Sequence, residues 1–140
     1  MKNCIRLASK EDKEWVLEIF SENKVILGGK GYGNLQWKRY WDNFQEKDNE
    51  RWIVIENKAF VHYLIRKRDG VKVVYEIATK NEHKKKGFGK MLIEFIGEPI
   101  ELKTDYDSEE SNSFYKKIGF VPLGVSYTKS KNKKMMNYKK

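Results

Sequence analysis

The spacing of apolar residues changes its period near the middle of the chain, and this change predicts a strand, a loop and a helix in succession. From Tyr75 to Thr79 the residues alternate with a period of two and include β-formers, which is typical of a strand. Apolar residues then recur at helical spacing, at Phe88, Met91, Leu92, Phe95 and Ile96. Residues 80–87, between the two patterns, are therefore predicted to connect a strand to an amphipathic helix.

The same patterns predict further strands and helices on both sides of this unit. Ser9, with Asp12 three residues later, is typical of a helix N-terminus, and the apolar positions that follow are Trp15, Val16, Ile19 and Phe20. Short polar turns separate the strands that precede the central unit, which predicts an antiparallel meander. We expect strands at residues 4–7, 52–56, 59–66, 71–79, 100–104, 120–128 and 134–139, and a last helix at 111–118.

The connecting loop carries a chemical signal. Together with the first turn of the helix, its residues are Lys84, Lys85, Lys86, Gly87, Phe88, Gly89 and Lys90. Glycines allow a ligand to approach the backbone closely, and the unpaired N–H groups of a helix N-terminus favour an anion. Three lysines add positive charge, so we predict a pyrophosphate site; the alternative is a turn with a basic face. The spacing provides neither the Gly-Lys-Ser/Thr of a Walker A loop nor the third glycine of a dinucleotide-binding fold.

Residues 84–89 resemble the acyl-CoA loop of the GNAT superfamily of N-acyltransferases, which has the pattern Arg/Gln-x-x-Gly-x-Gly/Ala after its fourth strand. Lys84 stands where the family has Arg or Gln. Residues 114–120, Phe-Tyr-Lys-Lys-Ile-Gly-Phe, are similar to a second family motif, Phe-Tyr-x-x-x-Gly-Phe, and the two motifs occur in the family's order. The resemblance covers nearly the whole chain and implies one GNAT-like domain over residues 1–140. Its fold class is α/β (α+β), with a mixed six- or seven-stranded sheet, mostly antiparallel, and about four flanking helices.

The resemblance implies how acetyl-CoA, the co-substrate, is held. In the family the fourth and fifth strands splay apart, and the pantetheine arm pairs with the exposed backbone of the fourth strand. Ile77, Ala78 and Thr79 occupy the matching positions, where a backbone N–H can also stabilise the thioester oxyanion. Many members bond the pantetheine arm through an asparagine seven residues before the motif's tyrosine. Ser108 occupies that position here, whereas Asn112 lies on the same helical face as the tyrosine, so either residue is a candidate.

The resemblance also implies the chemistry, in which an acyl group, usually acetyl, moves directly from CoA to a primary amine. Tyr115 matches the family's general-acid tyrosine, and a phenol of pKa about 10 is protonated at neutral pH and can donate to the leaving thiolate. The alternative for Tyr115 is a core tyrosine. The acceptor must lose a proton, because an alkylamine has a pKa of about 10.4. Glu76, on the fourth strand, is the first candidate for the base, directly or through water, and Glu101 is the second.

The acceptor side of the site is less well defined by the sequence. Four glycines within residues 28–33 predict a flexible loop, and aromatic residues follow it at helical spacing. This region carries the acceptor wall in the family, so Tyr32 and Trp37 are candidates for substrate binding; a loop beside a core-facing aromatic stripe is the alternative. His62 lies in a predicted strand, where a histidine usually packs, and contact with the acceptor is its second interpretation. Two histidines give no basis for a metal cluster, so no metal is expected.

Composition narrows the choice of partners. The net charge of +9 suggests nucleic acid, but six lysines after residue 128 supply +6, so a basic tail explains most of the excess. A nucleic-acid-directed acyltransferase and a non-catalytic CoA-binding module are the alternatives to an acetyltransferase of amines. A single cysteine, the lack of an apolar signal segment and the lack of a run of about 18 apolar residues predict a cytoplasmic protein without a membrane partner. The sequence does not predict the oligomeric state.

Overall fold

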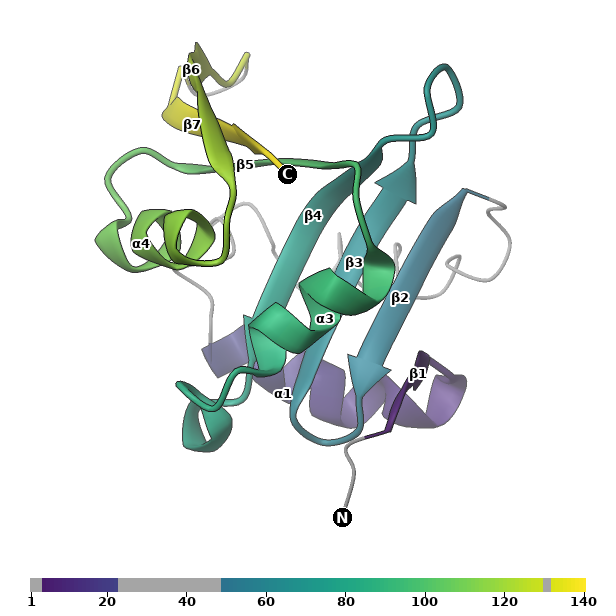
Figure 1. Ribbon diagram of the computed structural model, residues 1–140. Helices are drawn as coiled ribbons and strands as arrows, with labels where there is room; N and C mark the ends of the chain where they lie inside the picture. Colours follow the sequence, from purple (N-terminus) through teal and green to yellow (C-terminus); the bar gives the residue numbers. More distant parts are fainter. Residues whose placement is uncertain (1–3, 23–48, 130–131) are drawn as a thin grey trace.

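A seven-stranded sheet runs through the structure, with helices on both of its faces (Figure 1). This computed structural model describes residues 4–22, 49–129 and 132–140. The strand order is β1-β2-β3-β4-β5-β7-β6, and all neighbouring strands pair antiparallel except β4 and β5, which are parallel. The strands are β1 (Ile5–Leu7), β2 (Glu50–Ile55), β3 (Ala59–Ile65), β4 (Lys72–Thr79), β5 (Ile100–Asp105), β6 (Val121–Tyr127) and β7 (Lys134–Lys139). The helices are α1 (Lys13–Glu22), α3 (Phe88–Ile96) and α4 (Glu109–Lys117), with short 3-10 segments η1 (Lys10–Asp12) and η3 (Asn81–His83).

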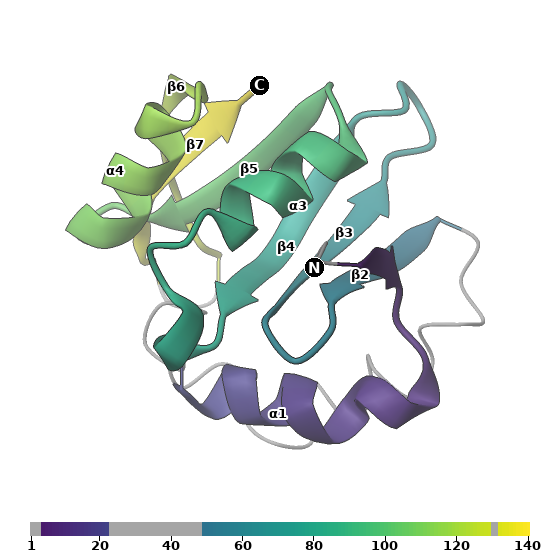
Figure 2. The ribbon, with the colours of Figure 1, turned by 60° about the horizontal axis from the view of Figure 1, so that its bottom comes forward.

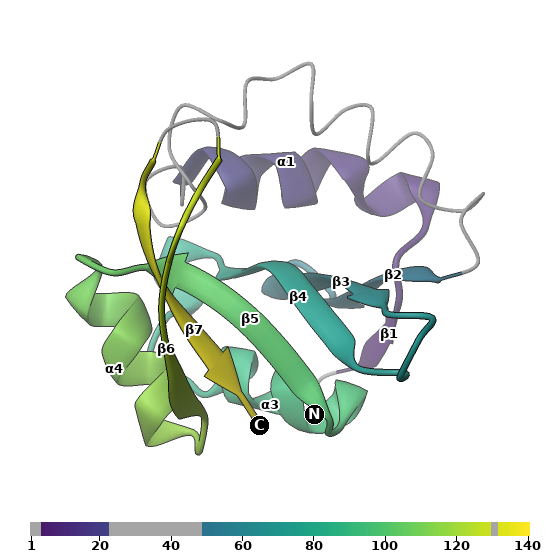
Figure 3. The ribbon, with the colours of Figure 1, turned by 90° about the horizontal axis from the view of Figure 1, so that it is seen from above.

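The sheet separates two apolar layers. Helix α1 covers one face, while α3 and α4 lie on the opposite face (Figure 3). Because successive side chains of a strand point to opposite faces, β2 supplies Trp52 and Val54 to the α1 layer and Ile53 and Ile55 to the α3 layer. Burial on both faces explains why residues 52–55 of this strand form a continuous apolar run.

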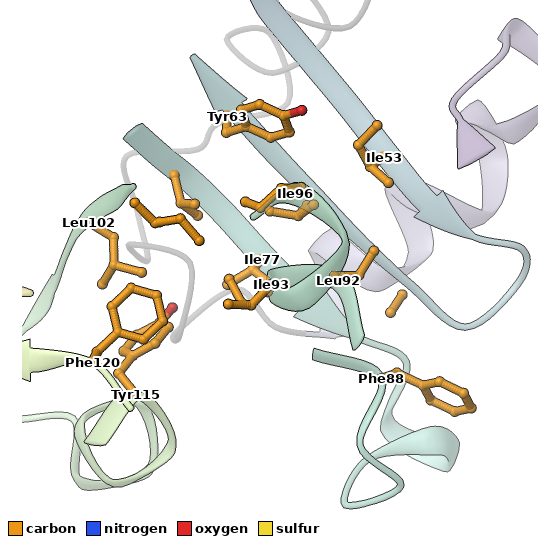
Figure 4. Packing of buried hydrophobic residues seen from close by; sticks show 14 of the residues in the cluster. Ile53, Tyr63, Ile77, Phe88, Leu92, Ile93, Ile96, Leu102, Tyr115 and Phe120 are labelled. Carbon is orange, nitrogen blue, oxygen red and sulfur yellow. The ribbon is translucent and has the colours of Figure 1, made fainter. Parts of the chain in front are cut away.

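The larger core lies between α3 and the sheet and extends to α4 (Figure 4). Leu92, Ile93 and Ile96 are buried on the sheet-facing side of α3. The predicted apolar face is only partly correct, because Phe95, which it included, is 52% exposed, and Ile93, which it left out, is buried. Fully burying a Leu or Ile side chain contributes about 1.5–3 kcal/mol. This face therefore anchors α3 and fixes where its N-terminus lies relative to β4.

The described elements match the predicted ones closely, with two differences. Three α-helices and two 3-10 segments lie in the described ranges, against about four predicted helices. The last helix begins at Glu109 rather than at residue 111, because the Ser108 hydroxyl caps it by accepting a hydrogen bond from the Ser111 N–H at 3.3 Å. Glu109 and Glu110 therefore lie in the first turn, at the positive end of the helix dipole. No helix in the described ranges is long and apolar enough to cross a bilayer.

Candidate active site

Strands β4 and β5 diverge after a short paired segment (Figure 2). Their parallel pairing covers three residues of β4 and ends with Val74 opposite Leu102. A β-bulge follows on β4, because Tyr75 is inserted between the residues that face Tyr63 and His62 of β3. A bulge bends the strand that carries it, so this one accounts for the angle at which β4 leaves β5.

Beyond the bulge, β4 keeps its pairing with β3 but not with β5. Ile77, Ala78 and Thr79, the three predicted pantetheine positions, all lie in this segment. The Ile77 side chain is buried in the core beneath α3, and the Ala78 side chain is buried in the α1 layer. Since the side chains are used in packing, the backbone groups at the open edge are what a ligand between the two strands would meet.

The loop after β4 leads to the N-terminus of α3, beside the opening between the strands (Figure 2). Lys85 and Gly87 both have positive φ angles, of 65° and 85°. The first hydrogen bond of α3 runs from the Met91 N–H to the Gly87 carbonyl at 3.0 Å. The N–H groups of the first three helical residues therefore lie before the first hydrogen bond of the helix and have no acceptor within it. Such N–H groups favour an anion.

The lysines of this loop surround the same helix end. Lys85, Lys86 and Lys90 are exposed, and Lys84 is half-buried. Lys90 approaches Glu94, one turn later in the helix, at 3.8 Å. The loop thus combines N–H groups that have no acceptor within the helix with positive charge. These are the two features predicted for a pyrophosphate site.

Gly87 and Gly89 are required in the loop for different structural reasons. A Cβ added to Gly87 would meet no atom within 4 Å, so its positive φ is the constraint and the space beside it is open. A Cβ added to Gly89 would lie 2.8 Å from Cζ of Phe114, so this glycine is also needed where α3 meets α4. The sequence suggests only the approach of a ligand for Gly89, and the contact with Phe114 is a second reason. Phe88 is buried in the core, with Lys58 Nζ 5.5 Å from the centre of its ring.

Tyr115 lies on the buried side of α4, in contact with the rings of Phe114, Phe120 and Tyr138. Figure 4 shows it beside Phe120 and near Leu102 of β5. Burial raises the pKa of Tyr115 above the ordinary phenol value, with a further contribution from Tyr138, so the hydroxyl is protonated at neutral pH. Within the described part of the chain this hydroxyl makes no hydrogen bond. The ring is a core residue and the hydroxyl is a free donor, so the two interpretations of Tyr115 are compatible.

The two candidates for the pantetheine arm both have roles in the fold. Ser108 caps α4, as described above. The Asn112 amide donates to the Ser108 carbonyl at 2.7 Å and to the Asp105 carbonyl at 3.0 Å, and its oxygen accepts from the Tyr138 hydroxyl. Asn112 therefore holds the turn between β5 and α4, and contact of either residue with pantetheine stays a prediction.

Glu76 is buried directly after the bulge and has a histidine partner. His62 Nδ1 lies 2.5 Å from Glu76 Oε2, and the two side chains are 1% and 4% exposed. The Trp52 ring stacks on the His62 ring at 4.1 Å between centroids, with an interplanar angle of 9°. Strand register places these three residues side by side on β2, β3 and β4. The result is a rigid polar pair at the point where β4 leaves β5.

The second candidate for the base, Glu101, lies at the closed end of the opening. It is opposite Val73 in the paired segment of β4 and β5. Its carboxylate accepts hydrogen bonds from Arg66 at 3.1 and 3.2 Å. A carboxylate already bonded to a guanidinium, away from the open edge, is less suited to proton transfer than Glu76.

The sequence does not reveal the pairing of His62 with Glu76. Regular hairpin pairing predicts His62 opposite Tyr75, and only the bulge brings Glu76 into register with it. The one available signal is that an ionisable residue occurs in the interior of each of two adjacent, mostly apolar strands. Tyr32 and Trp37, the candidates for acceptor binding, lie outside the described residues.

Comparisons with known proteins identify this arrangement. Residues 47–122, more than half of the chain, match the family model described as Acetyltransferase (GNAT) domain. No curated protein sequence matches the chain.

Solved structures with the same fold share little sequence with this chain. A Desulfovibrio desulfuricans protein assigned to the GNAT acetyltransferases is 12% identical, with a TM-score of 0.79 over 98% of this chain and 97% of that one. A spermidine N-acetyltransferase from Vibrio cholerae is 14% identical, with a TM-score of 0.74 over 97% and 93%. A Bacillus anthracis protein assigned as a streptothricin acetyltransferase, solved with acetyl coenzyme A, is 18% identical, with a TM-score of 0.58 over 71% and 66%.

The fold, the opening between β4 and β5 and the family match together define an acyl-CoA-dependent acetyltransferase. The chain belongs to the GNAT acetyltransferase family. The resemblance and the fold class predicted from the two sequence motifs are therefore confirmed.

Proposed function

We propose that this protein transfers an acetyl group from acetyl-CoA to a primary amine by direct attack within a ternary complex. One observation carries the proposal: β4 separates from β5 at the Tyr75 bulge, and the N-terminus of α3 lies beside the opening. This places a β4 edge that no longer pairs with β5 next to an anion-binding helix end. Those are the two sites that a pantetheine arm and a pyrophosphate require.

The residues of the loop and of the strand edge would hold acetyl-CoA, which supplies an activated acetyl thioester. Ile77, Ala78 and Thr79 offer backbone groups to the pantetheine arm, and an N–H among them stabilises the oxyanion. The helix end at Gly87 and the lysines of the loop bind the phosphates. The open space beside Gly87 supports this, since no atom lies within 4 Å of the position of a Cβ.

Two side chains act in the proton-transfer and hydrogen-bonding steps of the reaction. Glu76 accepts a proton from the acceptor ammonium, directly or through water, so that the nitrogen lone pair is free to attack. Tyr115 donates a hydrogen bond to the sulfur as the thiolate leaves. Because burial raises the pKa of Tyr115, the phenol is a weak acid, and stabilising the thiolate by a hydrogen bond is favoured over complete proton transfer.

The acceptor class is an amine, and its identity is a matter for experiment. One of the similar structures is a spermidine N-acetyltransferase, which makes a polyamine a reasonable first candidate. Tyr32 and Trp37 remain the proposed acceptor-binding residues.

A panel of amines tests the proposal. The full chain is incubated with acetyl-CoA and with spermidine, 1,4-diaminobutane, an aminoglycoside or a lysine peptide, while free thiol is recorded and products are identified by mass spectrometry. Calorimetry measures acetyl-CoA binding in parallel, and binding should raise the melting temperature by an amount that grows with ligand concentration. Binding without thiol release on any amine would favour a CoA-binding module. Lack of binding at millimolar acetyl-CoA would contradict both functions.

A further inference from the structure

The buried pair of His62 and Glu76 lies on the face of the sheet toward α1, which is largely apolar within the described residues. The next row of cross-strand neighbours, Val54, Phe60 and Ala78, is entirely apolar. Burial removes both polar groups from water, and a buried ionic pair is often no more stabilising than apolar residues of the same volume. Chemistry at this position therefore explains the pair better than packing does.

The geometry fixes the histidine more tightly than packing requires. Trp52 stacks face to face on the His62 ring, which holds the plane of the imidazole. His62 Nδ1 then points at Glu76 Oε2 from the neighbouring strand. With Glu76 ionised, Nδ1 carries the hydrogen and donates it, because a carboxylate only accepts. One carboxylate oxygen is thus held, and the other is left for a second partner.

We propose that His62 is a positioning residue for Glu76, an inference that rests on the role of Glu76 as the base in the proposed function. The hydrogen bond from Nδ1 fixes the carboxylate just beyond the Tyr75 bulge, where β4 turns away from β5. Oε1 of Glu76 then accepts the proton that leaves the acceptor ammonium, and the nitrogen keeps its lone pair for attack. His62 itself does not touch the acceptor in this arrangement.

Few other charged groups face the pair within the described residues. Helix α1 presents Val16 and Ile19, which are apolar and fully buried. From β2, Glu50 is on the same side of the sheet, and from β4 the Tyr75 ring lies 5.4 Å from the His62 ring. Lys80, beyond the end of β4, approaches α1 rather than the pair. Glu50 and Tyr75 are therefore the titratable neighbours of the pair. Substituting either residue should leave the effect of His62 substitutions on kcat/KM in place.

Substitutions of His62 separate positioning from packing. His62→Leu removes the donor, whereas His62→Asn keeps an N–H close to the place of Nδ1. Phe60→Leu is the matched packing control, one row along β3 on the same face. Each variant is made in the full chain, its folding is checked by thermal unfolding, and kcat/KM is measured across pH with acetyl-CoA and the panel amine that the wild-type protein acetylates fastest.

We expect His62→Leu to lower kcat/KM about 10- to 100-fold, because misplacing a catalytic group by about 1 Å has effects of this size. Acetyl-CoA affinity should not change, and His62→Asn should recover most of the loss. In a Glu76→Gln background, His62→Leu should have no further effect, because the two side chains act as one unit. Phe60→Leu should lose stability but keep kcat/KM and its pH profile. Nitrogen NMR of the histidine ring should show Nδ1 protonated, with the signal altered in Glu76→Gln.

The outcomes distinguish this inference from the proposed function. If Glu76→Gln is inactive while His62→Leu keeps full kcat/KM, the positioning role is overturned and the acetyltransferase function stands. If the wild-type protein acetylates no amine, the proposed function fails and the pair is structural. If His62→Leu does not fold, His62→Asn and the NMR experiment decide, and an Nδ1 without a bound hydrogen overturns the inference.

Discussion

At the scale of single residues, Asp12 shows how burial and hydrogen bonding compete. Its carboxylate accepts hydrogen bonds from Arg6 at 2.7 and 2.9 Å, from the Ser9 N–H at 2.8 Å and from Trp15 Nε1 at 2.9 Å. Burial raises its pKa, but these hydrogen bonds together outweigh burial and hold the pKa at about 2. The fold therefore selects the ionised form, which connects β1 to the start of α1.

Asp12→Asn should lower the free energy of unfolding at pH 7 by about 2 kcal/mol, since one pKa unit corresponds to about 1.4 kcal/mol. A carboxylate whose folded pKa is lowered stabilises the fold above its ordinary pKa of about 3.9 and loses that contribution as the pH falls. The difference between wild type and variant should therefore disappear between about pH 4 and about pH 2. Urea unfolding along this pH series measures it.

Asp69→Asn is the control for this prediction. A hydrogen bond from Arg66 lowers the pKa of Asp69, also to about 2, but this ion pair lies at the surface. Solvent screens exposed pairs, so we expect a much smaller change in stability. Equal effects of the two substitutions would contradict the importance of burial at Asp12.

Tyr115→Phe keeps the ring and removes only the hydroxyl. We expect kcat to fall about 10- to 100-fold, at or below the lower end of the range of about 10²–10⁴-fold for general acids, because a thiolate is a tolerable leaving group even without a full proton. Acetyl-CoA affinity should be nearly unchanged, since the hydroxyl acts in the transition state. Stopped assays with the best panel amine measure kcat, and calorimetry measures affinity.

Tyr138→Phe is the matched control, because Tyr138 is a buried neighbour whose hydroxyl donates to Asn112. It should reduce stability by loosening the turn between β5 and α4 while leaving kcat close to the wild-type value. Full kcat in Tyr115→Phe would show that Tyr115 is only structural.

At the scale of elements, the contact between Gly89 and Phe114 joins the two parts of the site. Gly89 belongs to the first turn of α3, which carries the proposed phosphate site. Phe114 precedes Tyr115 on α4. Their close approach fixes the distance between α3, which carries the proposed phosphate site, and α4, which carries the proposed acid. The packing of α3 against α4 is thus part of the site's geometry.

Gly89→Ala should destabilise the protein by about 1–3 kcal/mol, the usual cost of overpacking, although alanine is the better helix former. Adding Phe114→Leu should recover much of this loss, so the double mutant should be clearly non-additive. Chemical unfolding of the two single mutants and the double mutant measures the coupling.

Gly87→Ala is the comparison for Gly89→Ala. The space beside Gly87 is open but its φ is positive, so alanine costs about 1–2 kcal/mol of backbone strain. Phe114→Leu should not rescue it, because no contact is involved. Rescue of both glycine variants by Phe114→Leu would refute the proposed contact.

What the sequence predicts at this scale is what depends on local pattern. The alternation in β4 and the helical spacing of α3 predict both elements to within a few residues, and the loop between them follows from its glycines and lysines. Two features depend on contacts between distant segments and cannot be predicted from local patterns. They are the bulge at Tyr75 and the packing reason for Gly89. The use of Asn112 to hold a turn is local, but it depends on side-chain hydrogen bonds that residue spacing does not reveal.

At the scale of the whole molecule, the excess of positive charge is divided between the loop before α3 and the C-terminal segment. Part of the C-terminal charge is used inside the fold. Lys133 pairs with Asp105 at 2.9 Å, and Lys140 Nζ donates to the Ile118 carbonyl at 2.6 Å. These contacts join β7 and its turn to β5 and α4. The net charge of +9 therefore overstates what this segment offers to a polyanion.

Two double variants with the same change in net charge test where charge matters. Lys85, Lys86, Lys129 and Lys139 are all exposed. Lys85→Gln/Lys86→Gln should weaken acetyl-CoA binding about 2- to 30-fold, because each exposed charge pair contributes about 0.2–1 kcal/mol. Lys129→Gln/Lys139→Gln should leave both affinity and turnover of a small amine unchanged. The loop effect should shrink with salt, because the screening length falls from about 10 Å at 0.1 M to about 3 Å at 1 M. Calorimetry over this salt range measures the acetyl-CoA affinity of each double variant. Equal weakening by both double variants would mean that net charge, rather than the loop, attracts the phosphates. Loss of turnover in the C-terminal double variant alone would favour a polyanionic acceptor.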